Sequence, residues 1–448
     1  MKNTKIYFEK MITKGRSLAS RTLKDIRPVK GDTALAQLSN KSASLITARG
    51  QSSGIQIASD ILKIYSRSTK LEKLDYFKFL LTEFGRDKDE LIKSCLAYGE
   101  QPNHNNLKAL TNIMEPKRQD LFKRINMAPG GTEGLVDMRA DLLGLLKAHP
   151  ELKPVDLDFL LLFKTWFNRG FLTMEPISWK SPAAILERLI AYEAVHEITS
   201  WDDLKSRLDP SDRLCYAFFH PNLPNKPLIF VEVALCEDIP GSIQDILSPD
   251  REVLKNSQMK VAAFYSINNC LSGLRGIYFG NFLIKQVVEN LRAAHPKLKT
   301  FVTLSPIPGL VNWLGQQERA ARLSINAADM TRLQTPDWYE DADYTDKMKP
   351  IMRVAAIAYL LDRQSGSHRL QDSVARFHLG NGARIENIQW LADTSERGRA
   401  NSCAMMVNYL YELDDIEDNH EAFAVRHEVA LSASMKSLRK QSLNIVFD

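Results

Sequence analysis

The hydrophobic pattern of this chain changes its period near residue 176, and that change limits the folds open to it. Before this point apolar side chains recur at helical spacing, as at Ile57, Ile61 and Ile64. After it, short apolar runs typical of strands occur at residues 214–219, 228–235, 261–267 and 300–304. A helical pattern at 281–294 separates the last two runs. We therefore expect an α+β protein, with an all-helical first domain followed by a mixed α/β domain.

The length of 448 residues is enough for more than one domain. We expect a basic and poorly ordered N-terminal segment at 1–50, a helical domain at 51–176 and a mixed α/β domain at 177–448. The first segment has eleven Lys or Arg against three Asp or Glu, a local net charge of +8. Because the whole chain carries +5, the remaining residues sum to −3. Because residues 51–448 have no excess of basic side chains, the composition does not indicate nucleic-acid binding. A mitochondrial presequence is an alternative interpretation of the basic segment.

The composition indicates a globular protein in a reducing compartment. Hydrophobic residues make up 44% of the chain, and no apolar run approaches the roughly 20 residues needed to cross a bilayer. The cysteines are odd in number and widely scattered, without a CxxC pair, which favours reduced thiols. They are Cys95, Cys215, Cys236, Cys270 and Cys403.

Residues 301–310, FVTLSPIPGL, contain the first candidate for chemistry. An apolar run ends at Ser305, and two prolines follow that cannot continue a sheet ladder. We therefore expect the strand to stop with Ser305 at its mouth, where open α/β sheets place their ligands. A serine that only forms the turn is the alternative.

A glycine-bearing loop precedes the predicted helix at 281–294. It reads GLRGIYFGN, with Gly273, Gly276 and Gly280 leading to Asn281. Glycines let backbone N–H groups approach a ligand, and a helix N-terminus suits phosphate. The spacing matches neither the dinucleotide GxGxxG nor the Walker A pattern. A pyrophosphate site with Arg275 as an extra cation is one hypothesis, and a turn without a ligand is the other.

The second candidate for chemistry is His378, which is followed almost at once by a flexible turn, Gly380-Asn381-Gly382. This setting suits a histidine exposed at a cleft, where it could exchange a proton near neutral pH. Asn381 and the backbone around it could line an oxyanion site. A hydrogen-bonded structural histidine is the alternative.

No metal site is expected from the sequence. It contains no HExxH, GxSxG or zinc pattern. The acidic run at 412–421 lacks the carboxylate spacing of an EF-hand, and we interpret it as a solvated face.

Taken in order, these segments resemble the malonyl-CoA decarboxylase family. The resemblance covers most of residues 60–415 and includes TLSPIPGL at 303–310 and the block from FHLGNGA to MVNYLYEL at 377–413. Further stretches that carry it are 126–143, 166–198, 218–235 and 273–291.

The resemblance implies a helical oligomerisation domain, a GNAT-like (N-acetyltransferase fold) catalytic domain and a homotetramer. It also implies that Ser305 and His378 are the catalytic residues and that the glycine loop holds the CoA pyrophosphate. Tyr278 stands where animal members carry an acidic residue, so a role of that carboxylate does not carry over. Cysteines that animal members have near Ala183 and Pro221 are absent here, which argues against their inter-subunit disulfides.

The function implied is decarboxylation of malonyl-CoA to acetyl-CoA and CO2 without a metal or organic cofactor. Ser305 and His378 would position the carboxylate and deliver the proton, in an order that the sequence leaves open. An acyl-CoA N-acyltransferase and a non-catalytic CoA-binding scaffold are the alternatives. We expect a cytoplasmic enzyme without membrane or nucleic-acid partners; the mitochondrial matrix is the alternative location. The C-terminal tripeptide is not a peroxisomal signal.

Overall fold

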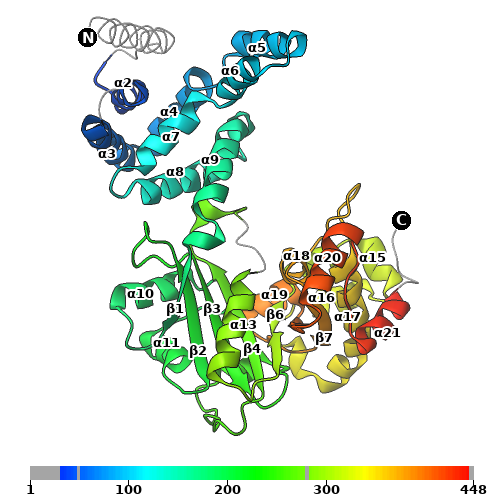
Figure 1. Cartoon of the computed structure of the whole chain (residues 1–448). Helices are drawn as coiled ribbons and strands as arrows, with labels where there is room; N and C mark the ends of the chain where they lie inside the picture. The colour runs from blue at the N-terminus through cyan, green and yellow to red at the C-terminus, as the bar shows by residue number, and fades with distance from the viewer. Residues whose placement is uncertain (1–30, 48–50, 278–281, 443–448) are drawn as a thin grey trace, which may run out of the picture. The chain divides into compact units, whose positions relative to one another are not determined.

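The structure of the chain is a computed structural model that describes residues 31–47, 51–277 and 282–442 (Figure 1). The chain divides into two compact units. The first comprises Met1–Leu172, His220–Pro224 and Leu271–Tyr278; the second comprises Thr173–Phe219, Asn225–Cys270 and Phe279–Asp448. All five cysteines lie in described segments and are free thiols. No helix of the described residues is both long and apolar enough to cross a membrane.

The first unit is built of helices, as predicted. Its elements, with short 3-10 helices labelled η, are α2 (Ala34–Ile46), α3 (Gln51–Arg67), α4 (Lys70–Glu83), α5 (Lys88–Glu100), α6 (His104–Met114), α7 (Lys117–Asn126), α8 (Gly131–Leu145), η1 (Pro150–Leu152), α9 (Lys153–Trp166), η2 (Arg169–Phe171) and η3 (Ser272–Leu274). Local sequence signals set several starts. Helix α4 opens with a capping box, in which Thr69 N–H donates to the Glu72 carboxylate at 2.8 Å.

Part of the segment predicted as a poorly ordered N-terminus is folded. Helix α2 buries Leu38 and Leu45 and packs against α3, α4 and α7. The hydroxyl of Ser42 lies 2.7 Å from that of Tyr76 in the same core. The prediction rested on the high net charge of residues 1–50 and was wrong for residues 34–46. Most of the basic residues precede residue 31 and lie outside the described residues. Residues 34–46, in contrast, are apolar on one face of a helix.

The second unit contains the sheet. Its strands are β1 (Thr173–Ile177), β2 (Arg213–Phe219), β3 (Ile229–Cys236), β4 (Val261–Asn269), β5 (Thr300–Thr303), β6 (Ser305–Pro306), β7 (Arg384–Gln389) and β8 (Met406–Leu410). Its helices are α10 (Ala183–Tyr192), α11 (Trp201–Leu208), α12 (Ile243–Leu247), α13 (Phe282–Ala294), α14 (Leu310–Leu314), α15 (Gln317–Arg322), α16 (Ala327–Arg332), η4 (Trp338–Glu340), α17 (Ala342–Leu361), α18 (Ser373–Gly380), α19 (Glu396–Ser402), α20 (Ile416–Glu421), the π-helical η5 (Ala422–Arg426) and α21 (Ala433–Ser442).

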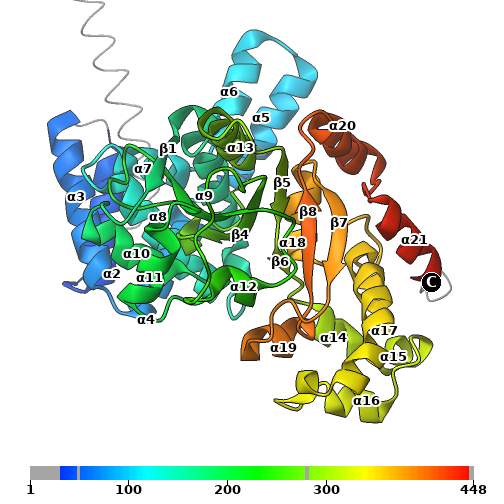
Figure 2. The same cartoon turned by 90° about the horizontal axis from the view of Figure 1, so that it is seen from below.

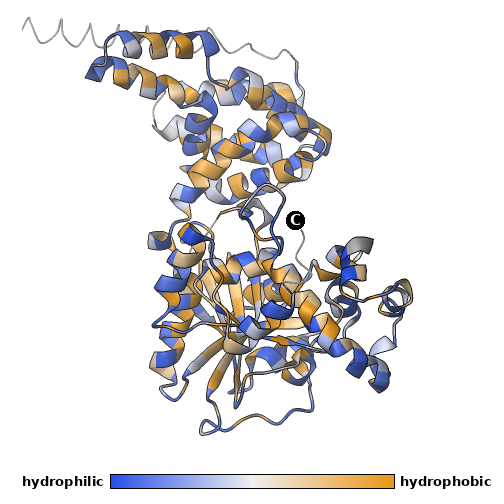
Figure 3. Ribbon diagram, turned by 90° about the vertical axis from the view of Figure 1, so that its right-hand side faces the viewer, coloured by the Kyte–Doolittle hydropathy of each residue, from blue (hydrophilic) through white to orange (hydrophobic). Residues whose placement is uncertain are grey.

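The sheet is mixed. Strands β1 to β4 form an antiparallel meander, and α13 then carries the chain to β5, which pairs in parallel with β4. Beyond β5 lies β8, which pairs antiparallel with β5, β6 and β7. The strands carry hydrophobic residues along their length (Figure 3). Helix α21 packs beside α17 and β7 (Figure 2). The α+β class, a helical unit followed by a unit with a mixed sheet, is therefore confirmed.

The four predicted strands correspond to β2, β3, β4 and β5, and the helix predicted at 281–294 is α13. The second unit begins with β1 at Thr173, close to the boundary predicted after residue 176. Two short segments of the predicted catalytic domain, His220–Pro224 and Leu271–Tyr278, are part of the first unit instead. Their side chains and backbone pack on α8 and α9; His220, for example, bonds the carbonyl of Trp166 at 3.2 Å.

Candidate active site

A seam opens in the sheet of the second unit where two parallel strands part. Strand β4 pairs with β5 only from Val261 to Phe264, and Leu304 N–H donates the last bond to the carbonyl of Phe264 at 3.0 Å. Beyond this point β4 continues along β3, whereas the chain after Leu304 turns toward β8. The parting strands leave room between them for a ligand.

A cavity of about 360 Å³ lies at this seam. Strands β3 and β4, helices α13 and α18, and a loop after α10 supply its walls. The lining residues are Val195, Ile229, Val231, Phe264, Tyr265, Ile267, Asn269, Leu283, Ile284, Ser305, Pro306, Ser373, Val374, Phe377 and His378. Most are apolar, so the few polar groups that face the cavity lie in a largely apolar environment, where their hydrogen bonds are strengthened.

Ser305 lies at the seam, just after the end of strand β5 at Thr303, as predicted. The prediction that the prolines end all sheet pairing was wrong, because Ser305 and Pro306 form the two-residue strand β6 against β8. Proline is tolerated there because β6 ends the sheet. The Ser305 hydroxyl donates to the Thr303 hydroxyl at 2.9 Å, and Thr303 Oγ1 also accepts from Tyr409 N–H at 3.1 Å. Ser305 is thus held on two sides.

His378 faces Ser305 across the cavity from α18. Its Nε2 lies 3.1 Å from Ser305 Oγ, so residues 73 positions apart form a hydrogen-bonded pair. The expectation of an exposed histidine at a turn was wrong: His378 lies inside α18 and is 3% exposed. The turn begins only after the helix, at Asn381. Burial lowers the pKa of His378 to about 3, so the ring is neutral at physiological pH.

Two tyrosines of the β8 region fix the ring of His378. The Tyr409 ring stacks on it with centroids 4.6 Å apart, and the Tyr411 hydroxyl lies 2.8 Å from Nδ1. Because Ser305 donates to Thr303, its oxygen accepts from Nε2–H of a neutral imidazole, and Nδ1 then accepts from Tyr411. A chain of hydrogen bonds therefore runs from Tyr411 through His378 and Ser305 to Thr303.

The glycine loop has a structural reason for its first glycine. A Cβ on Gly273 would lie 2.0 Å from the carbonyl oxygen of Val136 in α8, so only glycine allows this packing. Arg139 of α8 donates through Nη1 to the carbonyls of Gly273 and Arg275, at 2.7 and 2.8 Å. Gly276 has a φ of +80°. These residues belong to the first unit, whereas Ser305 and His378 belong to the second. The pyrophosphate site stays a prediction.

Three further predicted or flagged positions, Tyr278, Gly280 and Asn281, lie outside the described residues. Asn381, the predicted oxyanion donor, caps α18: its backbone N–H donates to the carbonyls of Phe377 and His378, both at 3.1 Å. It is not among the described residues that line the cavity. Its oxyanion role stays a prediction.

In the described part of the chain, no three His, Cys, Asp or Glu side chains lie close enough together to bind a metal ion.

Comparisons with known proteins identify the family. The family model for the malonyl-CoA decarboxylase C-terminal domain matches residues 170–446, and that for the N-terminal domain matches residues 84–167. The chain belongs to the malonyl-CoA decarboxylase family. It is 35% identical to the mitochondrial malonyl-CoA decarboxylase of Anser anser anser over 358 residues, which cover 73% of this chain and 70% of that protein.

Solved structures agree with this assignment. The crystal structure of malonyl-CoA decarboxylase from Rhodopseudomonas palustris shares 45% identity with a TM-score of 0.85, covering 91% of this chain and all of that one. The one from Agrobacterium vitis shares 45% identity with a TM-score of 0.84, covering 90% of this chain and 99% of that one.

Sequence reasoning missed Tyr411, Thr303 and Val195. Thr303 precedes Ser305 by two residues in a predicted strand, a spacing that places both side chains on one face and could have suggested it. Tyr411 lies 33 residues after His378, and nothing in the local sequence connects the two. Val195 comes from an irregular loop without a recognisable signal.

Proposed function

We propose that this protein decarboxylates malonyl-CoA to acetyl-CoA and CO2. The observation that carries the proposal is the 3.1 Å contact between Ser305 and a neutral, buried His378 in an apolar cavity, in a chain of this family. The thioester of the substrate accepts the electron pair that CO2 leaves behind, so the reaction requires neither a metal nor an organic cofactor.

The cavity walls orient the malonyl group so that the breaking C–C bond overlaps the thioester π system. Ser305 and His378 position the leaving carboxylate. Donors to the developing enolate oxygen are each worth about 3–4 kcal/mol of barrier. We propose Asn381 and the backbone N–H groups of the glycine loop as these donors. For the pyrophosphate of CoA, we propose a site formed by Gly273, Arg275, Gly276, Gly280 and Asn281.

The hydrogen-bond chain supplies the final proton. Ser305 gives its hydroxyl proton to C2 of the enolate and recovers one from Nε2–H of His378. Nδ1 takes the Tyr411 proton in the same movement, so the ring stays neutral and only exchanges its tautomer. The resulting Tyr411 phenolate is then protonated from solvent. This order makes Ser305 the direct proton donor and His378 the relay.

The direct test is incubation of purified protein with malonyl-CoA, with acetyl-CoA followed by chromatography. We expect turnover in the wild type and loss of most of it in Ser305→Ala and in His378→Ala, with CoA binding retained by calorimetry. His368→Ala, which removes an exposed histidine stacked on His427, is the matched control and should keep wild-type rates. A well-folded wild type that forms no acetyl-CoA refutes the proposal.

The same assay separates the alternatives. An N-acyltransferase would consume acetyl-CoA only when an amine is added. A non-catalytic scaffold would bind CoA without turnover and be indifferent to both alanine changes. A non-catalytic scaffold does not require a buried serine hydrogen-bonded to a histidine, so the 3.1 Å contact between Ser305 and His378 disfavours it.

We further propose a homotetramer assembled through the helical domain and a place in fatty acid metabolism. Helices α5 and α6 bury none of their own residues, and Ile92, Leu96, Leu107 and Met114 are exposed on them. For the location we propose the cytoplasm, with the mitochondrial matrix as the alternative that the relatives' names raise. Import of a reporter fused to residues 1–50 into isolated mitochondria would decide for the matrix.

A further inference from the structure

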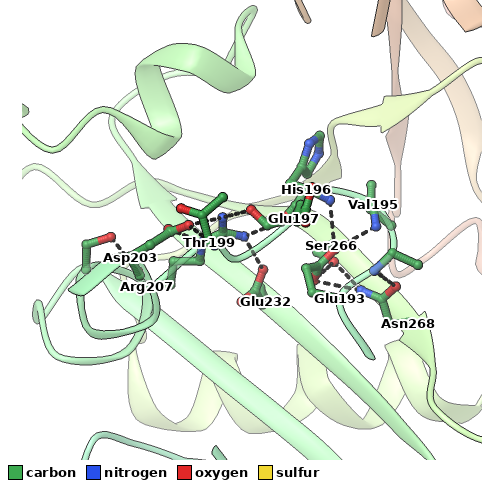
Figure 4. A network of polar contacts seen from close by, with 12 residues as sticks. Glu193, Val195, His196, Glu197, Thr199, Asp203, Arg207, Glu232, Ser266 and Asn268 are labelled. Carbon is green, nitrogen blue, oxygen red and sulfur yellow. Dashed lines mark hydrogen bonds and ion pairs between the residues drawn. The ribbon is translucent and has the colours of Figure 1, made fainter. Parts of the chain in front are cut away.

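The loop between α10 and α11, residues 193–197, has no regular secondary structure, yet side chains bind most of its backbone. Figure 4 shows these contacts. The N–H of Ala194 donates to Asn268 Oδ1 at 3.0 Å. The N–H groups of Val195 and His196 donate to one oxygen of the Glu193 carboxylate, at 2.7 and 2.8 Å. We call residues 193–197 the Val195 loop.

The Glu193 carboxylate anchors this loop to β4. Its second oxygen accepts from Ser266 Oγ at 2.7 Å and from Asn268 Nδ2 at 2.8 Å. Glu193 is buried, so these charge-assisted bonds are shielded from water.

The carbonyl groups of the loop are bound from other elements. Arg207 of α11 donates to the carbonyls of His196 and Glu197, at 2.7 and 3.0 Å, and is itself held by Asp203. Arg397 of α19 donates to the carbonyl of Ala194. Side chains from three elements thus fix the loop, which makes the position of Val195 rigid.

Val195 lines two cavities at once. One is the 360 Å³ cavity that contains Ser305 and His378. The other is a cavity of about 820 Å³ lined mainly by polar residues, among them His196, Asp393 and Arg397. Val195 is the one lining residue that the two cavities share within the described residues, so it lies where they adjoin.

Contacts of strand β4 place the Val195 loop close to the pair Ser305 and His378. The carbonyl of Phe264 binds the residue before Ser305, and the Glu193 carboxylate binds Ser266. These two points are two residues apart along β4, on either side of an irregularity in its pairing with β3, and so are at most roughly 7 Å apart. The Val195 loop therefore joins β4 close to where the acyl group reacts.

We propose that Val195 determines acyl specificity by limiting the size of the alkyl substituent on C2 of a malonyl thioester. This inference rests on the proposed function. A rigid wall cannot retreat before a larger substituent, and one methylene group in such a pocket changes kcat/KM by about 10- to 200-fold. A smaller residue at 195 joins the two cavities and gives the substituent room.

The test compares kcat/KM for malonyl-CoA, methylmalonyl-CoA and ethylmalonyl-CoA. We expect Val195→Ala and Val195→Gly to raise the ethylmalonyl-to-malonyl ratio by about tenfold or more over wild type. Val195→Ile should instead lower the methylmalonyl-to-malonyl ratio, which keeps the test valid if the smaller variants fold poorly. Thermal melting verifies the fold of each variant.

The matched control is Val253→Ala, the same change at an exposed valine that lines neither cavity. Its ratios should stay within about twofold of wild type. The inference is wrong if the Val195 variants also stay within twofold, or if Val253→Ala shifts the ratio as much as Val195→Ala. A wild type that is inactive on malonyl-CoA overturns the proposed function and this inference with it, whereas an active wild type with unchanged ratios overturns the inference alone.

Discussion

The two nitrogens of the His378 ring have different partners, and this difference sets its tautomer. Ser305 is at Nε2 and Tyr411 is at Nδ1. Tyr411→Phe leaves a buried nitrogen without its donor, which costs about 1–3 kcal/mol. We expect kcat to fall by roughly tenfold or more. Tyr409→Phe is the control, because Tyr409 stacks on the same ring while its hydroxyl makes no hydrogen bond to the described residues. Equal losses in both variants would contradict the relay.

The lowered pKa of His378 predicts an unusual pH profile. An ordinary histidine titrates near 6.5, whereas burial lowers the pKa of His378 to about 3. The ring therefore stays neutral throughout the working range, and kcat should show no ionisation of His378 between pH 5 and 8. The measurement is the initial rate at saturating malonyl-CoA. An acid limb near pH 6.5 that disappears in His378→Gln would show that the ring becomes protonated in the enzyme–substrate complex.

At the scale of elements, two glycine-to-alanine substitutions measure how tightly η3 packs on α8. Gly273→Ala would bring a Cβ to 2.0 Å from a backbone oxygen of α8, and we expect it to destabilise the protein by about 2 kcal/mol or more. Gly144→Ala lies in α8 itself, where no atom lies within 4 Å of the added Cβ, and should stabilise by about 0.5–1 kcal/mol. Melting temperatures measure both. A neutral Gly273→Ala would mean that this packing is loose.

The sequence predicts the elements unevenly, for a physical reason. Strands β2 to β5 are apolar runs whose burial on both faces leaves a strong signal, as in Phe230 and Val231. Strand β7 reads RIENIQ and alternates only weakly, because part of it is half-exposed. Ser305 could be singled out from its prolines and His378 from the following glycines. Tyr411 and Val195 could not, because only the folded sheet brings them to the site.

At the scale of the whole molecule, stability depends on the buried Glu232. Burial, together with the nearby Glu193, raises its pKa to about 8 from an ordinary value near 4.5. The folded state therefore binds more protons than the unfolded state between these values. The stability that protonated Glu232 contributes is complete below about pH 4.5 and is lost as the pH rises through 8.

Glu232→Gln cannot ionise, so its melting temperature should rise relative to wild type as the pH increases from 5 to 9. The unfolding constants should diverge by at most about tenfold per pH unit. The control is Glu237→Gln, an exposed glutamate just after β3, whose difference from wild type should not vary in this way. A constant difference for Glu232→Gln would mean that Arg207, 3.6 Å away, keeps the carboxylate ionised.

The proposed homotetramer can be tested by substituting exposed apolar residues of α5 and α6. The double variant Leu96→Glu/Leu107→Glu places charge on surfaces that a subunit contact would bury, so it should lower the mass measured by light scattering below that of a tetramer. Leu71→Glu, on the exposed side of α4, is the control and should leave the mass unchanged. An unchanged mass in the double variant would place the contact elsewhere.

The hydrogen-bond chain from Tyr411 through His378 to Ser305 has a consequence for the solution around the protein. The chain gives up one proton in each turnover and regains one from solvent before the next, so the hydrogen that ends on acetyl-CoA comes from the medium. Each turnover converts a carboxylate and one proton into uncharged CO2 and a new C–H bond. In weak buffer the reaction should therefore turn the solution alkaline, one proton per CO2 formed before hydration. A pH indicator dye can then follow the reaction without a coupling enzyme.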